Sequence, residues 1–343
     1  MNCIPMQRYF KQVFIKNYIF VKVMNTYKAN NESILRASKI IKSGGLVAFP
    51  TETVYGLGAD GLNPIAVAKI FEAKKRPAFN PLILHIADKI WVKKLSSIEN
   101  ERVEQLINKF WPGPLTLVLP KTELVPDIVT SGNPTVAVRM PNHSVAIRLI
   151  EMSGRPIAAP SANKFGHLSP TEAAHVAKYL GDKVDMILDG GKSTVGVEST
   201  ILQFHENNFY LLRHGGLSKE EIEKEIGEIK FGITDENTPN SPGQLPFHYS
   251  PHTPLRFFNE KFLDEDKRIG ALFFKENKFK FPFADARVLS PKGDLREAAA
   301  NLFSFLHDLE KENLDLILVE PIEEKGLGQA IMDRLRKATK QHE

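Results

Sequence analysis

A basic cluster at Lys74, Lys75 and Arg76 is the feature of this sequence that points most directly to chemistry. The cluster ends a stretch with helical spacing, Pro77 stops that stretch, and a polar turn over residues 79 to 81 follows. Three cations at one fixed point can hold a polyanion, and an arginine can grip a phosphate or carboxylate through two parallel hydrogen bonds. The cluster therefore predicts a binding site for an anionic substrate.

Other polar residues lie on predicted strands or in the loops at their ends, and together they extend this site. Taken singly, each has an ordinary explanation as a surface charge, a helix cap or a structural histidine. Taken together, several cations and small hydroxyl groups beside glycine turns are suited to a nucleoside triphosphate and a carboxylate. These residues are Thr53, Asn80, His85, Thr135, Arg139, Ser161, Asn163, Ser169, Ser199 and Arg213.

Familiar catalytic motifs give no competing assignment. The sequence has no H-E-x-x-H pattern, no Cys/His metal spacing and no Ser-His-Asp ordering. Residues 190 to 194 contain the end of a phosphate loop, but Met186 stands where its first glycine is required. Residues 56 to 61 match the dinucleotide pattern G-x-G-x-x-G, yet we interpret them as a glycine turn because no helix follows at once. Chemistry by positioned charge, with a metal ion brought by the nucleotide, fits best.

Alternating strands and helices must position these residues. The hydrophobic pattern predicts an open α/β sheet. Its strands are expected at 46 to 49, 82 to 86, 115 to 119, 136 to 139, 157 to 158, 186 to 188 and 199 to 204, and its helices at 33 to 42, 65 to 74, 99 to 110, 143 to 152 and 171 to 180. Residues 232 to 254 are rich in Pro, Gly, Asn and Ser, which is typical of a linker. A second, smaller α/β domain is expected beyond it, with strands at 269 to 274, 286 to 289 and 314 to 319 and helices at 293 to 311 and 328 to 339.

Composition limits the class of protein. The chain has 343 residues, 42% of them hydrophobic and 25% charged, which is enough for two domains with separate cores. A single cysteine, Cys3, favours the reducing cytoplasm, and the net charge of +4 does not by itself indicate a nucleic-acid binder. The apolar runs within residues 1 to 31 are too short for a signal-peptide core or a membrane span. Residues 1 to 31 contain no acidic residue, and we expect a disordered or wrongly extended start, with Met24 as initiator, rather than a targeting segment.

Seven segments in fixed order resemble the YrdC/Sua5 family of L-threonylcarbamoyladenylate synthases. They are PTETVYGLGADG, KKRPAFNPLILH, WPGPLTLVLP, TVAVRMP, APSAN, SPT and GVEST. The segments SPGQLPFHYSP and EEKGLGQAIMDRLRKAT are similar to the two-domain Sua5 type. The resemblance implies an extension at 1–31, a YrdC-like catalytic domain with a twisted open mixed sheet at 32–231, a linker or lid at 232–254, and a Rossmann-like α/β Sua5 domain at 255–343.

This resemblance implies a reaction and a set of site residues. L-threonine, bicarbonate and ATP would give threonylcarbamoyl-AMP and pyrophosphate, and the product would pass to the machinery that makes threonylcarbamoyladenosine in tRNA. Mg²⁺ would arrive with ATP, with no protein ligand expected. The ATP residues would be Lys74, Arg76, Asn80, Thr135, Ser161, Asn163, Ser169, Arg213 and Tyr249, with Lys75 the bystander. The threonine residues would be Thr53, His85, Arg139, Ala159 and Ser199.

Roles for the catalytic candidates follow from the charges in this reaction. Carbamate formation and attack on the α-phosphorus both bring anions together, so fixed cations must offset their repulsion. Arg139 is the candidate clamp for the carboxylate of threonine. Lys74 and Arg76 would hold the triphosphate and the leaving pyrophosphate. His85 would orient threonine or accept a proton from its ammonium group.

Two other functions stay open at this point. The first is an RNA-binding module on a YrdC-like fold, which would use the Lys74 cluster for phosphate contacts but would not need His85, Ser161, Asn163 or Ser199. The second is carbamoyl transfer in hydrogenase maturation, which would require zinc-finger-like cysteines that a chain with Cys3 alone does not have.

The linker suggests one further hypothesis. Phe247, His248 and Tyr249 lie between prolines and have the aromatic and polar character of a lid that excludes water from a labile anhydride. A plain tether between the domains is the alternative.

Overall fold

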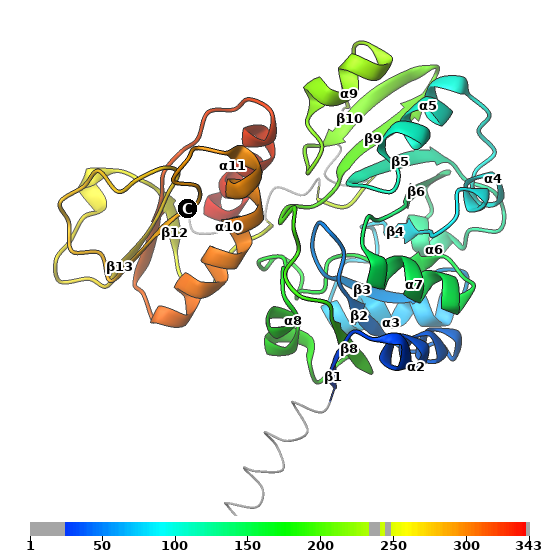
Figure 1. Cartoon of the computed structure of the whole chain (residues 1–343), viewed down its shortest axis with the longest axis horizontal. Helices are drawn as coiled ribbons and strands as arrows, with labels where there is room; N and C mark the ends of the chain where they lie inside the picture. The colour runs from blue at the N-terminus through cyan, green and yellow to red at the C-terminus, as the bar shows by residue number, and fades with distance from the viewer. Residues whose placement is uncertain (1–24, 233–240, 244–247, 341–343) are drawn as a thin grey trace, which may run out of the picture.

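The computed structural model describes residues 25–232, 241–243 and 248–340 (Figure 1). The predicted extension up to residue 24 and the lid candidate Phe247 lie outside these residues. The described chain forms two bodies, one around a large mixed sheet and one around a small parallel sheet, in agreement with the predicted fold class. No helix among the described residues is long and apolar enough to cross a membrane.

The larger body is built on an eleven-stranded sheet of order β1-β8-β2-β3-β7-β4-β6-β5-β9-β10-β11. Its strands are β1 (Thr26–Lys28), β2 (Val47–Phe49), β3 (Gly56–Asp60), β4 (Ile83–His85), β5 (Leu115–Pro120), β6 (Thr135–Arg139), β7 (Ile157–Ala158), β8 (Met186–Asp189), β9 (Thr200–His205), β10 (Asn208–Arg213) and β11 (Lys230–Phe231). Its helices are α2 (Asn31–Lys42), α3 (Pro64–Lys74), α4 (Ile90–Leu95), α5 (Glu101–Phe110), α6 (Asp127–Thr130), α7 (Ser144–Ser153), α8 (Ala173–Leu180) and α9 (Lys219–Ile226).

Helix α3 shows how local sequence places the basic cluster. The side chain of Asn63 caps its first turn by accepting from the backbone N–H groups of Ile65 and Ala66, and Pro64 occupies the first helical position. Lys75 ends the helix in the left-handed conformation, with φ of 52°. The chain therefore reverses at Lys75, which separates the exposed Lys75 from the buried Lys74 and Arg76.

Two predictions about the larger body are wrong in detail. Residues 56 to 60 are not a turn but the strand β3, which lies between β2 and β7. Glycine is needed there because a Cβ at Gly58 would lie 2.7 Å from the ring of Phe49 and 2.8 Å from Ile157. Thr26–Lys28, expected to lie outside the folded protein, form β1 and pair in parallel with β8.

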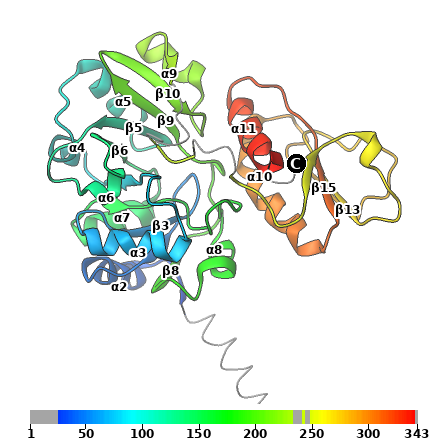
Figure 2. The same cartoon turned by 180° about the vertical axis from the view of Figure 1, so that it is seen from behind.

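The smaller body holds four parallel strands in the order β12-β15-β13-β14. They are β12 (Leu255–Phe257), β13 (Ile269–Phe273), β14 (Asp285–Val288) and β15 (Leu316–Val319), with the helices α10 (Leu295–Leu309) and α11 (Leu327–Thr339) and the 3₁₀ turns η1 (Glu260–Phe262) and η2 (Glu310–Glu312). Figures 1 and 2 show α10 and α11 on the side of this body that faces the larger one. Both helices therefore lie at the contact between the bodies.

The hydrophobic core of the smaller body continues into the larger one. Val54, Leu168, Val197 and Tyr249 pack in the same cluster as the buried residues of α10 and α11. Val54 and Tyr249 also line the pocket described below. The smaller body therefore packs against residues that line the pocket.

Candidate active site

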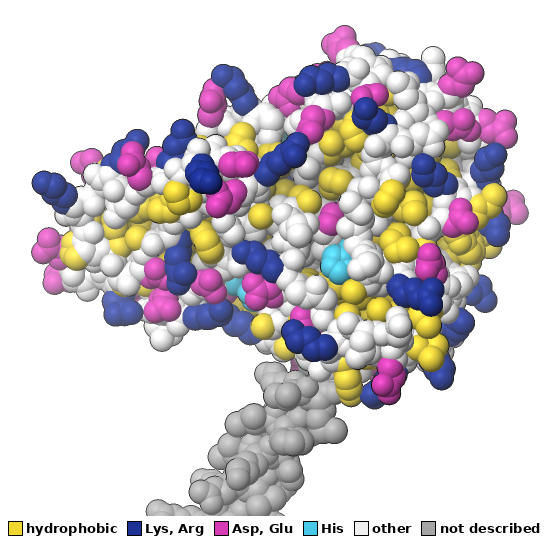
Figure 3. All heavy atoms as spheres, in the orientation of Figure 1, with side chains coloured by type: hydrophobic (Ala, Val, Ile, Leu, Met, Phe, Trp, Pro, Cys, Tyr) yellow, Lys and Arg dark blue, Asp and Glu magenta, His cyan; other side chains and the backbone are white. Residues whose placement is uncertain are grey.

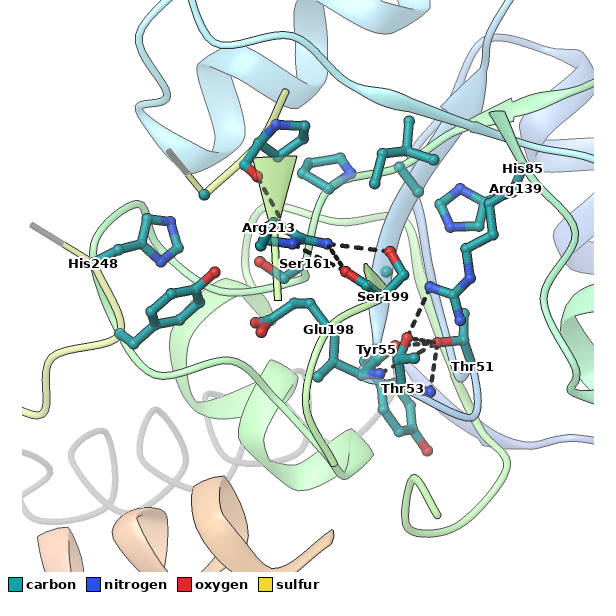
Figure 4. Close-up of a pocket in the computed structure, with 18 of the residues that line it drawn as sticks. Thr51, Thr53, Tyr55, His85, Arg139, Ser161, Glu198, Ser199, Arg213 and His248 are labelled. Atoms are coloured by element: carbon teal, nitrogen blue, oxygen red, sulfur yellow. Dashed lines mark hydrogen bonds between the residues drawn. The ribbon is translucent and has the colours of Figure 1, made fainter. Parts of the chain in front are cut away.

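A pocket opens in the larger body where the strand-end loops converge (Figure 4). The empty space between its lining residues, including space open to solvent, is about 540 Å³. Of the predicted site residues, nine line it: Thr53, Arg76, His85, Arg139, Ala159, Ser161, Ser199, Arg213 and Tyr249. The other five, Lys74, Asn80, Thr135, Asn163 and Ser169, do not.

Strand register explains why the residues predicted for threonine meet. β4 and β6 are parallel neighbours, and His85 pairs with Arg139 at the ends of both strands. β7 runs antiparallel on the other side of β4, and its last residue is followed directly by Ala159. Sheet pairing therefore brings together side chains that are far apart in the sequence.

Arg139 is held in place by three partners. Its Nε donates to the carbonyl oxygen of Gly113 at 3.2 Å, and its Nη1 donates to Oγ1 of Thr53 at 2.9 Å. Its Nη2 lies 2.7 Å from Oε1 of Glu52, and both side chains of this ion pair are buried. Figure 4 shows Arg139 pointing toward Thr53 at one end of the pocket. The guanidinium is thus fixed before any substrate arrives.

His85 lies beside Arg139 and is fully enclosed. Burial, and secondarily the charge of Arg139, lower the pKa of His85 to about 3. The imidazole is therefore neutral at pH 7 and is a weak base. Of the two roles expected for His85, this electrostatic setting favours orienting a substrate over accepting its proton.

Two further arginines form the other half of the pocket. Arg76 donates through Nε to the backbone carbonyl oxygen of Asn80 at 3.0 Å and through Nη2 to its side-chain oxygen at 2.6 Å. Asn80, which does not line the pocket, thus orients the guanidinium of Arg76. Arg213 donates to the carbonyl oxygen of Ser199, at 3.1 Å from Nε and 2.9 Å from Nη2, and to Oγ of the same residue at 3.1 Å. Burial lowers the pKa of Arg76 to about 9, so this side chain is still a cation at pH 7.

Lys74 is buried and turned toward the loop at 161 to 163. Its Nζ donates to the carbonyl oxygens of Ser161 and Asn163 and, at 3.2 Å, to the side-chain oxygen of Asn163. Burial, and secondarily Arg76, hold the pKa of Lys74 well below its usual value. In this structure Lys74 therefore supports the loop that presents Ser161, and a direct contact with triphosphate stays a prediction.

The remaining predicted residues lie outside the pocket lining. Asn163 donates to the carbonyl oxygen of His167 at 2.6 Å, and Oγ of Ser169 donates to the carboxylate of Glu198. Thr135 begins β6, about 13 Å along the strand from Arg139. The structure gives Asn163 and Ser169 supporting positions and does not bring Thr135 to this pocket.

No role was predicted for two acidic residues of the site. Glu52 stands in the segment PTET and Glu198 in GVEST, so both lay within segments already singled out. Glu52 pairs with Arg139, and Glu198 is the one carboxylate among the described residues that line the pocket. Their positions next to Thr53 and Ser199 could have indicated that both carboxylates belong to the site. Which arginine each one pairs with depends on the fold.

The segment predicted as a lid reaches the pocket. His248 and Tyr249 line it together with Pro242 and Gly243. Arg213 Nη1 donates to the carbonyl oxygen of Pro242 at 3.1 Å. The described part of the linker therefore contacts an arginine of the pocket directly.

The fold and the site define an α/β protein with a pocket lined by arginine side chains. Three buried guanidinium groups face one pocket, and no group of three or more His, Cys, Asp or Glu residues in the described part of the chain is arranged to hold a metal ion.

Comparison with known proteins identifies the family. The model of the Sua5, YciO and YrdC family, described as "Telomere recombination", matches residues 39–215, and that of the threonylcarbamoyl-AMP synthase C-terminal domain matches residues 217–339. The chain belongs to this family, in its two-domain Sua5 form.

Relatives along the whole chain support this assignment. The threonylcarbamoyl-AMP synthase of Pyrococcus abyssi is 47% identical over 88% of this chain and 93% of its own length, and that of Bacillus subtilis is 41% identical over 93% and 96%. The crystal structure of P. abyssi Sua5 complexed with L-threonine matches with a TM-score of 0.84 and 44% identity, over 92% of this chain and 97% of that one.

Proposed function

We propose that this protein is an enzyme that condenses L-threonine, bicarbonate and ATP to threonylcarbamoyl-AMP and pyrophosphate. The observation that carries the proposal is the excess of positive charge in the pocket, where Arg76, Arg139 and Arg213 face a single lining carboxylate, Glu198. Buried guanidinium groups of like charge repel one another, and a bound polyanion relieves that repulsion. The long, full-length similarity to threonylcarbamoyl-AMP synthases agrees with this reaction.

The two halves of the pocket suit the two organic substrates. Arg139, His85 and Ser199 would surround threonine, with the planar guanidinium clamping its carboxylate. Ala159 would contact its methyl group, an apolar contact that discriminates against serine by roughly 1–3 kcal/mol. Arg76 and Arg213 would bind the phosphates of ATP.

The reaction then follows by displacement at two centres. The amine of threonine attacks the carbon of bicarbonate, water leaves, and a carbamate remains. A carbamate oxygen attacks the α-phosphorus of ATP, and the bond to pyrophosphate breaks. The fixed arginines stabilise negative charge on both sides of that bond. Mg²⁺ would enter with ATP and neutralise part of the triphosphate charge.

The product and the setting complete the proposal. Threonylcarbamoyl-AMP is a mixed anhydride, and the machinery that modifies tRNA would consume it in the cytoplasm. His248 and Tyr249 would close over the nucleotide as a lid. The RNA-binding alternative is not favoured, because the arginines are buried in the pocket and the face in Figure 3 carries interspersed positive and negative side chains rather than a basic patch.

The test is threonine-dependent release of pyrophosphate from ATP in the presence of Mg²⁺ and bicarbonate. We expect release with the intact protein and a loss of at least about 100-fold in Arg76→Ala, since removing one preorganised charge contact costs that much. Lys75→Ala is the matched control, because Lys75 is exposed beside Arg76. Release that does not depend on threonine would contradict the proposal.

Arg139 is tested separately through threonine. Arg139→Lys keeps the charge but loses the planar fork, so we expect the KM for threonine to rise while the affinity for ATP changes little. An unchanged KM for threonine would contradict the proposed contact between Arg139 and the carboxylate of threonine.

A further inference from the structure

One arginine of the second body reaches the wall of the catalytic pocket. Arg334 lies on α11 and is 1% exposed. Its Nε donates to Oε2 of Glu198 at 2.9 Å, and its Nη1 donates to the carbonyl oxygen of His214 and to Oδ2 of Asp333, both at 2.7 Å. Arg334 thus spans the contact between the two bodies.

The partner of Arg334 is the carboxylate of the pocket. Glu198 precedes Ser199, lines the pocket and accepts a hydrogen bond from Ser169 through its other oxygen. Burial raises the pKa of Glu198, but Arg334 and then Arg213 outweigh this effect and hold the pKa below its usual value. Glu198 is therefore an anion at the wall of a site that must receive anions.

Arg334 also contacts the linker. Its guanidinium carbon lies 5.1 Å from the centroid of the Tyr249 ring, within the range of a cation–π interaction. Tyr249 is buried, lines the pocket and has a φ of 66°, in the left-handed region that non-glycine residues seldom adopt. One side chain from α11 therefore contacts both the pocket carboxylate and the linker tyrosine.

We propose that Arg334 is a positioning residue of the active site, through which the second body neutralises and orients Glu198 so that the pocket accepts a nucleoside triphosphate. This inference rests on the proposed function and deepens it. Without Arg334, a buried carboxylate would face the phosphates, or would take up a proton. Breaking one side of a buried charge pair is costly because the other charge is left uncompensated.

The test uses the full chain and five variants. Arg334→Met removes the charge, Arg334→Lys retains it, Glu198→Gln neutralises the carboxylate, and the fourth variant combines Glu198→Gln with Arg334→Met. Arg336→Met is the matched control, because Arg336 lies on the same helix and pairs with Glu324 on the surface. The measurements are the kcat and the KM for ATP in pyrophosphate release between pH 6 and 8.5, ATP binding by calorimetry, and thermal unfolding.

We expect Arg334→Met to raise the KM for ATP by about 30-fold or more, in line with truncating one partner of a buried charge pair. Relative to wild type, this rise should be larger at high pH, because Glu198 without its partner has a raised pKa and becomes charged as the pH increases. The double variant should recover much of the affinity and lose that pH dependence. Arg334→Lys should be intermediate, and Arg336→Met should match wild type.

The outcomes separate this inference from the proposed function. Wild-type protein without threonine-dependent pyrophosphate release would contradict the function, and ATP binding by calorimetry would still test Arg334. A normal KM in Arg334→Met, or a double variant as impaired as Arg334→Met at every pH, would overturn the inference. If Arg334→Met does not fold, Arg334→Lys and Glu198→Gln provide the test instead. An affinity for ATP in Arg334→Lys equal to that of wild type, with no change in the pH profile, would also overturn the inference.

Discussion

Nη2 of Arg139 lies 2.7 Å from Oε1 of Glu52, and neither side chain is more than 6% exposed. Nε and Nη1 of Arg139 donate hydrogen bonds to Gly113 and Thr53. A buried arginine without a counterion would carry a large desolvation cost, and the pairing with Glu52 offsets part of that cost. Glu52 does not line the pocket, which leaves the pocket side of Arg139 for a substrate carboxylate.

Replacing Glu52 with glutamine should therefore weaken the fold. We expect Glu52→Gln to lower the free energy of unfolding by about 3 kcal/mol, because Arg139 would remain buried without its counterion. Urea unfolding measures this change. Glu72→Gln is the control, since Glu72 is exposed on α3. Equal stability of both variants would show that the ion pair contributes nothing to stability.

Substitutions of Lys74 and Lys75, the neighbouring lysines of the basic cluster, should differ in their effects on stability and on affinity for ATP. Lys74→Met should lower both stability and affinity for ATP, because the loop at 161 to 163 would lose the donor to its carbonyl oxygens. We expect a loss of about 1–3 kcal/mol of stability, the cost of leaving buried acceptors unpaired. Lys75→Met should leave both properties within error of wild type. Calorimetry of ATP binding and urea unfolding of both variants measure this difference. Equal impairment of the two variants would contradict the prediction.

The sequence allowed the strand-end loops to be predicted but not their long-range contacts. Residues such as Arg139 and His85 could be recognised because each ends a short apolar strand, and parallel pairing of those strands brings them together. The strand β3 was missed because Gly56 and Gly58 suggest a turn. Their alternation with Leu57 and Ala59 reflects close packing against Phe49. The contact between Arg334 and Glu198 joins residues 136 positions apart, and no local pattern indicates such a pair.

Stability should depend on pH through two stacked histidines at the contact between the bodies. His175 of α8 and His307 of α10 have ring centroids 3.8 Å apart, and Nε2 of His307 lies 3.1 Å from the carbonyl oxygen of Ser169. Burial lowers the pKa of both side chains to about 3. The unfolded chain, with a histidine pKa of about 6.5, therefore binds protons between pH 6.5 and 3 that the folded chain does not.

Stability should thus be fully present above about pH 6.5 and fall as the pH decreases toward 3, by up to about 1.4 kcal/mol per pH unit for each histidine. Urea unfolding at several pH values between 7.5 and 4.5 measures the slope. The variant His175→Gln/His307→Gln should have a shallower slope than wild type, even if it is less stable at pH 7.5. His205→Gln, on an exposed side chain, should keep the wild-type slope. An unchanged slope in the double variant would assign the pH dependence to other groups.

Gly196 lies directly against α10 of the smaller body. Its φ is +75°, and a Cβ there would lie 2.4 Å from the carbonyl oxygen of Ala299 and from Cα of Ala300, both on α10. Gly191 has a similar φ of +87°, but a Cβ there would meet nothing within 4 Å. Alanine at either site carries a backbone strain of about 1 kcal/mol, so the comparison of the two variants isolates the clash.

We expect Gly196→Ala to be less stable than Gly191→Ala by a further 1–3 kcal/mol, roughly the cost of overpacking a close contact. Relief of the clash requires α10 to move away from the larger body, and α11 packs against α10. Arg334 would then be drawn away from Glu198, so Gly196→Ala should also raise the KM for ATP while Gly191→Ala should not. Calorimetric unfolding and pyrophosphate release measure the two effects. A Gly196→Ala protein with lowered stability but a normal KM for ATP would separate the packing of α10 from the state of the pocket.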